Sequence, residues 1–310
     1  EANMYAIRLA RAYTGKSKII KFEGGWHGGY DALHVGVKHP FDVPEAAGLT
    51  VGATQDTVLA VFNNLEDVKA KVQKNSAAAI IIEPILGAGG CIPAEKEFLK
   101  GLREICDERG ILLIYDEVIT GFRLAPGGAQ QYYGVLPDIT VFGKILGGGF
   151  PVGAFCGRRE IMERLNPLMY ERPNYSFHGG TFCANPITMA AGLATLKVLE
   201  DGNIISRLNG AGEKVRKTLR EIFEVKGIRV QVTGAGSIFT THFTSKEVRN
   251  ARDTFEGDKK RLAEYHTNLI ARGAFFLPTH FGSISAAHTD ADMEKLFQAT
   301  EDYAKTIGKI

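Results

Sequence analysis

Short apolar runs rich in β-branched residues alternate with amphipathic stretches in the first two thirds of the chain, and this alternation is the feature that most constrains the fold. We predict strands at residues 18–22, 78–83, 111–116, 139–142 and 152–156. Residues 95–108, between the second and third strands, gather their apolar side chains on one helical face. Two strands joined by such a crossover helix pair in parallel. The pattern therefore predicts an α/β protein with a mostly parallel central sheet flanked by helices.

The predicted elements change character near residue 200. A long apolar helix follows Asn185-Pro186 and is broken at Asp201-Gly202. Beyond it come the elements of a small α+β unit, which are helices at 205–223, 262–271 and 292–306 and strands at 228–232 and 237–243. We expect a large domain at residues 1–200 and a small C-terminal domain at residues 201–310. Residues 1–11 have a helical pattern, but no capping residue precedes it. The natural chain is therefore expected to begin further upstream.

Charge and cysteine usage narrow the class of partner. The formal net charge is +2, from 37 basic and 35 acidic residues with no basic run, so neither nucleic acid nor an anionic membrane is an expected partner. The four cysteines show no CxxC pair and no metal-type spacing with histidine, which predicts free thiols in a reducing compartment and no metal site. We also see no apolar run long enough to cross a bilayer and no leader. The expectation is a cytoplasmic enzyme acting on small molecules.

Two charged residues follow neighbouring strands of the predicted sheet. Asp116 ends the run 111–116, and Lys144 follows the run 139–142 ahead of the triplet Gly147-Gly148-Gly149. Taken singly, the aspartate is more often a turn or cap residue, the lysine a solvated one and the glycines a loop. Ligands of open α/β sheets bind at the carboxyl ends of the strands, however, and the two residues lie one βαβ-like step apart, so they can meet on one ligand.

A ligand that needs both an amine and a carboxylate is pyridoxal 5'-phosphate. Its aldehyde forms a Schiff base with a lysine, and an ionised aspartate keeps its ring nitrogen protonated so that the ring accepts electrons. The glycines after Lys144 would let that side chain move close to the backbone. A nucleotide phosphate loop is the weaker interpretation of these glycines, because no G-x-G-x-x-G or G-x-x-x-x-G-K-[ST] string follows a strand.

Several strings resemble one family of pyridoxal phosphate enzymes. They are Asp116-Glu-Val-Ile-Thr-Gly-Phe-Arg123, Gly127-Gly-Ala-Gln130, Tyr133-Gly-Val-Leu-Pro-Asp138, Gly143-Lys144 and Gly147-Gly-Gly-Phe-Pro-Val-Gly-Ala154. They are similar to the class III aminotransferases, close to the glutamate-1-semialdehyde 2,1-aminomutase subgroup. The similarity runs through nearly the whole chain and is strongest from about residue 80 to 200. It implies the fold type I architecture of pyridoxal phosphate transferases, with a large domain and a small C-terminal domain.

The resemblance also implies roles for residues around the cofactor ring. Lys144 matches the Schiff-base lysine and Asp116 the partner of the ring nitrogen. Val118 matches the apolar residue on one face of the ring, and Trp26 matches the aromatic residue on the other face, although an ordinary core tryptophan is the alternative. Neighbouring His27 is expected to orient backbone rather than to transfer protons, and Glu83 of the Glu83-Pro84 pair is expected beside the cofactor.

The phosphate of the cofactor is expected to lie between two chains. The segment from His178 to Pro186 resembles a loop whose threonine, here Thr181, reaches the phosphate of the neighbouring subunit, with the N–H of Gly180 beside it. Helix capping is the alternative role for Thr181, although the helix starts some distance beyond it. A homodimer with shared active sites follows. The family's second phosphate contact, a Ser-Gly-Thr type turn, should immediately precede Glu1-Ala2 and is absent from this sequence. Either the sequence is part of a longer chain, or the protein is a truncated relative that is expected to bind its cofactor poorly.

The reaction type stays open between three alternatives. Ala88 stands where aminomutases of the subgroup carry an asparagine, and the run Gly87-Ala-Gly-Gly-Cys91 looks more like the β-amino-acid transaminases. Gly121-Phe-Arg123 and Pro151-Val-Gly-Ala154 look more like the aminomutases. We favour a transaminase with a small-molecule amino donor and carbonyl acceptor, ahead of an aminomutase. A non-catalytic relative that binds pyridoxal phosphate is the third alternative.

Overall fold

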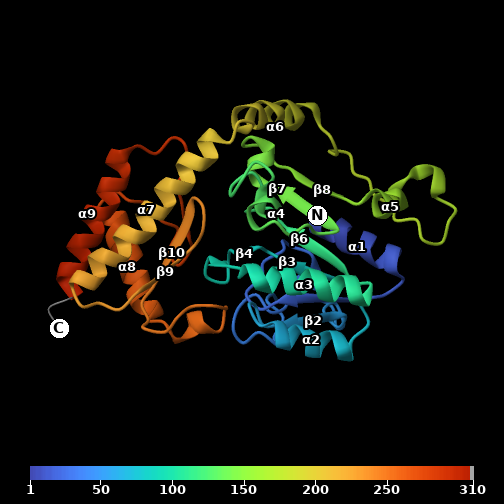
Figure 1. The fold of residues 1–310 in the computed structure, drawn as a ribbon, viewed down its shortest axis with the longest axis horizontal. Coiled ribbons are helices and arrows are strands. Elements are labelled where there is room, and N and C mark those ends of the chain that lie inside the picture. The colour runs from blue at the N-terminus through green and yellow to red at the C-terminus, as the bar shows by residue number, and fades with distance from the viewer. Residues whose placement is uncertain (308–310) are drawn as a thin grey trace.

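The computed structural model describes residues 1–307 and shows two bodies joined by two consecutive helices (Figure 1). The larger body holds the first strands and helices of the chain. Its main elements are α1 (Ala2–Thr14), β1 (Lys18–Phe22), β2 (Thr57–Ala60), α2 (Leu65–Lys74), β3 (Ala77–Ile82), β4 (Ile85–Leu86), β5 (Ile92–Pro93), α3 (Lys96–Arg109), β6 (Leu112–Asp116), α4 (Gly128–Tyr133), β7 (Ile139–Gly143), β8 (Gly153–Gly157) and α5 (Arg159–Met162).

A six-stranded sheet forms the centre of this body, in the order β2-β1-β3-β6-β7-β8. Neighbouring strands are parallel throughout, except that β8 runs antiparallel to β7. The predicted α/β class and the parallel pairing of β3 with β6 through α3 are confirmed, whereas β2 at the sheet edge was not predicted. Its side chains are largely half-buried and its sequence, Thr-Val-Leu-Ala, is short.

Both faces of the sheet are covered, which explains why its central strands are apolar without alternation. One face packs on α2 and α3 through side chains such as Ile80, Leu113 and Leu99, and the other packs on α1 through side chains such as Ile81 and Ile7. All residues of β3 and β6 are buried. The carboxyl ends of the four parallel strands β1, β3, β6 and β7 therefore share one edge of a rigid sheet.

The smaller body follows α6 (Pro186–Leu199) and is built on the long helix α7 (Asn203–Val225). Its remaining elements are β9 (Gln231–Thr233), β10 (Ile238–His242), α8 (Lys259–Ala271), β11 (Gly282–Ser283) and α9 (Asp290–Ile307), with the three strands in the antiparallel order β11-β10-β9. A separate apolar core holds these elements together. The division into domains at residue 200 stays a prediction.

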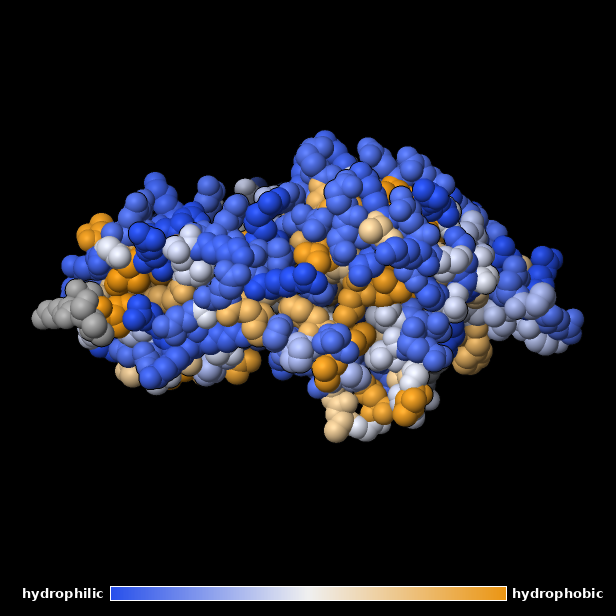
Figure 2. All heavy atoms as spheres, turned by 90° about the horizontal axis from the view of Figure 1, so that it is seen from below, coloured by the Kyte–Doolittle hydropathy of each residue, from blue (hydrophilic) through white to orange (hydrophobic). Residues whose placement is uncertain are grey.

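The surface combines hydrophilic areas with exposed apolar ones. Figure 2 shows a mainly hydrophilic face on which hydrophobic residues gather over the larger body and near the junction of the two bodies. Helix α6 lies on the side away from this view and exposes Ile187, Leu193 and Val198. Among the described helices, none combines the length and the hydropathy required to span a bilayer.

The packing of α7 on the small sheet can be tested with two glycines of the same helix. A Cβ atom on Gly212 would lie 2.0 Å from the Gly236 carbonyl oxygen, whereas one on Gly210 would have no neighbour within 4 Å. We expect Gly210→Ala to stabilise the protein by up to about 1 kcal/mol through helix propensity. Gly212→Ala should destabilise it by about 1 to 3 kcal/mol through overpacking. Thermal unfolding followed by circular dichroism measures both, and equal melting temperatures for the two variants would contradict this packing.

Candidate active site

Four segments that leave the carboxyl edge of the sheet bring the predicted site residues together. The loop with Trp26 and His27 follows β1, and Glu83 directly follows β3. Asp116 is the last residue of β6, where it pairs with Val141 of β7, and Lys144 follows β7 directly. This placement is the one expected for ligand-binding residues of an open α/β sheet.

Asp116 is a buried carboxylate held by three separate segments. Its Oδ2 accepts a hydrogen bond from Asn3 Nδ2 of α1 at 2.7 Å and lies 2.8 Å from His27 Nδ1. Its Oδ1 accepts from the Val118 N–H at 3.1 Å. Burial lowers the pKa of His27, so the imidazole is neutral and donates its Nδ1 proton to the carboxylate. His27 thus orients the Asp116 carboxylate through its side chain, and its carbonyl accepts a hydrogen bond from Asn3.

Lys144 occupies an unusual backbone position at the start of the 3-10 turn η2 (Lys144–Gly147). Its φ of 45° lies in the left-handed region, which costs a residue other than glycine about 1 to 3 kcal/mol and is found most often at functional sites. Desolvation lowers the pKa of its amine, against the opposing charges of Asp116 and Glu83. A lower pKa favours the neutral amine, which is the form that attacks a carbonyl carbon.

Glu83 ties the loop after β1 to the turn between β4 and β5. Its Oε1 accepts from the Trp26 N–H at 2.8 Å and its Oε2 from the Gly87 N–H at 3.2 Å. Burial, followed by the negative charge of Asp116, raises the pKa of Glu83. Glu83 therefore shapes the walls of the site and lies within electrostatic reach of Asp116.

The two residues predicted to face a cofactor ring are in accessible positions. Trp26 is 43% exposed and meets the His34 ring edge-on, with 5.3 Å between the centroids, so it is not an ordinary core tryptophan. Val118 is half-buried, and a Cβ atom on Gly143 would lie 3.2 Å from its Cγ1. Glycine at 143 thus lets Val118 approach the backbone next to Lys144. The contact of either side chain with a ring stays a prediction.

Thr181 and Gly180 lie in an exposed loop ahead of α6. This loop is fastened to α1, because Tyr5 donates its hydroxyl proton to the Gly179 carbonyl at 2.9 Å. The side chain that caps α6 is Asn185, which accepts from the Thr188 N–H at 3.0 Å, so Thr181 is not the cap. Among the described residues, no hydrogen bond links Thr181 to Lys144 or Asp116. Its role at a phosphate stays a prediction.

Two residues of the site escaped the sequence analysis. Asn3 is 6% exposed and bonds both Asp116 and the His27 carbonyl, and no spacing in the sequence signals this pairing. The guanidinium of Arg123 donates to the hydroxyls of Ser237 and Ser283 in the smaller body. Burial lowers the pKa of Arg123, and within residues 1–307 no carboxylate forms an ion pair with it. It is a partly buried cation at the junction of the two bodies.

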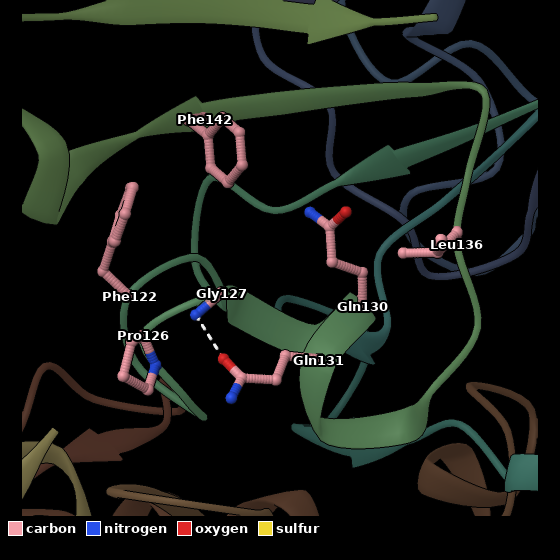
Figure 3. Close-up of a pocket in the computed structure, with 7 residues that line it drawn as sticks. All are labelled: Phe122, Pro126, Gly127, Gln130, Gln131, Leu136 and Phe142. Atoms are coloured by element: carbon pink, nitrogen blue, oxygen red, sulfur yellow. Dashed lines mark hydrogen bonds between the residues drawn. The ribbon is translucent and has the colours of Figure 1, made fainter.

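A pocket of about 370 Å³ lies beside this edge (Figure 3). It is lined by the rings of Phe122 and Phe142, by two glutamines and by neighbouring turn residues, namely Phe122, Pro126, Gly127, Gln130, Gln131, Leu136 and Phe142. Phe142 stands two residues before Lys144, but none of the predicted site residues lines the pocket. We therefore assign it no part in the chemistry.

The groups at the sheet edge fit pyridoxal 5'-phosphate. The amine of Lys144 can bond an aldehyde carbon, and the Asp116 carboxylate is fixed by neighbours that all donate to it, which keeps it an acceptor for a ring N–H. The exposed Trp26 indole offers a face for stacking.

Comparison with known proteins decides the family. The family model described as aminotransferase class-III matches residues 1–289. The chain belongs to this family. Its cofactor is accordingly pyridoxal 5'-phosphate, and its substrates are small molecules.

Curated relatives and solved structures that are similar to this chain represent two reaction types. A glutamate-1-semialdehyde 2,1-aminomutase of Methanothermobacter thermautotrophicus is 42% identical over 307 residues, which are 97% of this chain and 72% of the relative. An omega-transaminase from Sphaerobacter thermophilus superposes with a TM-score of 0.91 at 35% identity, covering 98% of this chain and 72% of that one. A transaminase with PLP bound superposes with a TM-score of 0.86 at 30% identity, covering 98% and 71%. The predicted family, fold and cofactor are confirmed.

The role of Asp116 can be tested by replacing its charge. Asp116→Asn should still bind the cofactor but lose several orders of magnitude in turnover, because an amide does not hold a proton at the ring nitrogen. Steady-state kinetics and the visible absorption of the purified variant measure the two effects separately. A variant within about tenfold of the wild type, a barrier difference of roughly 1.4 kcal/mol, would show that the carboxylate is structural.

Proposed function

We propose that this class III aminotransferase is a transaminase, which moves an amino group from an amino acid, β-amino acid or amine donor to a keto acid or aldehyde. The proposal rests mainly on the presence of an alanine at position 88, in the turn between β4 and β5. It follows Gly87, whose N–H donates to Glu83, and its methyl group cannot donate a hydrogen bond there. By the resemblance described above, aminomutases of this subgroup place an asparagine at that point.

Each residue of the site has a separate role in the proposed amino transfer. When bound, pyridoxal phosphate supplies a carbonyl carbon for the amino group and a ring that accepts electrons. Lys144, as the neutral amine, would take the proton from the substrate carbon onto Nζ and hand it on to the carbonyl carbon that the cofactor supplies. Asp116 keeps a proton at the ring nitrogen, while Asn3 and His27 hold the carboxylate in place. A transaminase then releases its carbonyl product before the second substrate binds, whereas an aminomutase retains the intermediate.

Arg123 supports a substrate that carries a carboxylate. Its Nη1 and Nε atoms have acceptors, namely two serine hydroxyls and the Ile119 carbonyl, whereas no acceptor is described for Nη2. Its positive charge is close enough to lower the pKa of Lys144. An arginine without an acidic partner favours a planar anion. We infer that amino acids or β-amino acids are better donors than amines without a carboxylate.

A screen of donors and acceptors tests the reaction type. We expect amino transfer from carboxylate-bearing donors to a keto acid, and a higher KM for these donors in Arg123→Met, with little change for a neutral amine. An isomerisation assay on glutamate-1-semialdehyde is run beside the screen. Fast isomerisation without release of a carbonyl product would contradict the transaminase assignment and establish the aminomutase.

We further propose that a second copy of the chain covers α6 and shares the active sites. Helix α6 is apolar on nearly all sides, and a helix of this kind is normally buried. Ile187, Met189, Leu193 and Val198 are exposed on it in the single chain. A Cβ atom on Gly192 would lie 2.4 Å from the Leu146 carbonyl oxygen, so α6 rests directly on the turn that begins at Lys144. A partner covering α6 would therefore lie next to the site.

Mixed dimers test the sharing of sites through Thr181. A hydrogen bond from its hydroxyl to a phosphate contributes roughly 1.5 to 3 kcal/mol, so Thr181→Ala should weaken cofactor binding by ~10- to 100-fold. If Thr181 serves the neighbour, exchange between Lys144→Ala and Thr181→Ala chains gives dimers with one intact site. Activity at limiting cofactor should then exceed that of either parent. Activity that does not rise after exchange would contradict a shared site.

A further inference from the structure

The strand β1 carries a lysine in the interior of the protein. Lys21 lies between Ile20 and Phe22 and is fully buried. Its ammonium group donates to three backbone carbonyl oxygens, those of Gly25 at 2.9 Å, Leu33 at 2.9 Å and Val35 at 2.7 Å. An ammonium group has three protons, and here each proton has its own acceptor.

The three acceptors belong to one segment, residues 25–35, which contains Trp26 and His27. The Gly25 carbonyl directly precedes Trp26, and the Leu33 and Val35 carbonyls lie where the segment returns toward the sheet. Backbone bonding closes the segment at its base, because the Gly24 N–H donates to the Gly36 carbonyl at 2.7 Å. Lys21 therefore ties the outgoing and returning halves of one loop to a central strand.

A buried cation at this position is costly for the fold. Desolvation lowers the pKa of Lys21 to about 8, although the charges of Glu83 and Glu45 oppose the shift. No hydrogen bond or ion pair to a carboxylate compensates the ammonium within the described residues, so carbonyl dipoles alone satisfy it. An apolar side chain of similar length would fill the strand position without this penalty. What a lysine provides here, and an apolar side chain does not, is a set of three donors that fix the geometry of the loop.

We propose that Lys21 is a positioning residue, which holds the loop carrying Trp26 and His27 at the cofactor edge of the sheet and thereby sets the affinity for pyridoxal 5'-phosphate. The proposal rests on the placement of Trp26 against the cofactor. His27 transmits the same constraint to Asp116, since its imidazole lies 2.8 Å from the carboxylate. Lys21 itself contacts neither the substrate nor the reacting atoms, because its three protons all point to backbone.

The fluorescence of Trp26 offers a direct test, because it is the sole tryptophan of the sequence. Lys21→Met removes the three donors at similar length. Lys18→Met is the matched control on the same strand, where Lys18 Nζ donates to the Asn75 side chain at 2.7 Å and not to the loop. In the protein without cofactor, we expect Lys21→Met to raise acrylamide quenching at least twofold and to lower the fluorescence anisotropy. Lys18→Met should match the wild type.

The second readout is binding of pyridoxal 5'-phosphate, titrated through the quenching of Trp26. We expect Lys21→Met to bind about tenfold or more weakly, a loss of about 1.4 kcal/mol or more. Lys21→Gln retains two N–H donors and should fall between Lys21→Met and the wild type in both readouts.

Three outcomes would overturn the proposal. Quenching and affinity of Lys21→Met equal to those of Lys18→Met would show that the loop does not need the lysine. A loosened loop with unchanged affinity would show that the loop does not set cofactor binding, while leaving the transaminase assignment intact. Loss of the far-UV circular dichroism of the fold in both Lys21 variants would show that the lysine serves the whole sheet. Failure of the transaminase assignment alone would leave the first readout unaffected.

Discussion

The burial of one negative charge organises the active site of this protein. Asp116 is 3% exposed, and a carboxylate removed from water must be satisfied by donors. These donors come from α1, from the loop after β1 and from the turn after β6, through Asn3, His27 and the Val118 N–H. Segments that are distant in the sequence are thus fixed relative to one another around the carboxylate that we propose to face the ring nitrogen of the cofactor.

Three positively charged residues of this region differ in the partners that they contact. Lys144 is held in a left-handed backbone conformation. Desolvation lowers the pKa of its amine. Lys21 is buried beneath the neighbouring loop, where three carbonyl groups satisfy it. Arg123 stands at the junction with the smaller body and bonds two of its serines. Lys144 remains available for chemistry because Lys21 is committed to backbone carbonyls, while Arg123 keeps its Nη2 for the substrate carboxylate that we propose.

Much of this arrangement could be predicted from the sequence. The strand β1 spans the predicted residues, β6 and β7 differ from the predictions by one residue at one end, and β3 is shifted by one residue. These strands were predictable because fully buried parallel strands are mostly apolar. Asp116 and Lys144 were recognisable because they end such strands. Lys21 interrupts the apolar run Ile19-Ile20-Lys21-Phe22, and this interruption is a signal that the sequence analysis did not use.

Other features depend on contacts that no local pattern encodes. The bond from Asn3 to Asp116 joins residues far apart in the chain, and the edge strand β2 is too short and too weakly apolar to stand out. The left-handed conformation of Lys144 has no signature in its side chain. Thr181 is exposed in the single chain, and the contact that we propose for it lies on a second copy, which the sequence of one chain does not describe.

We propose that Lys144 alone holds the cofactor covalently. The direct measurement is borohydride reduction of the protein loaded with pyridoxal 5'-phosphate, followed by mass spectrometry of its peptides, with Lys144→Ala as the control. The account predicts a pyridoxyl group on Lys144 in the wild type and on no lysine in the variant. A pyridoxyl group on another lysine in the wild type, or one that persists in Lys144→Ala, would contradict it.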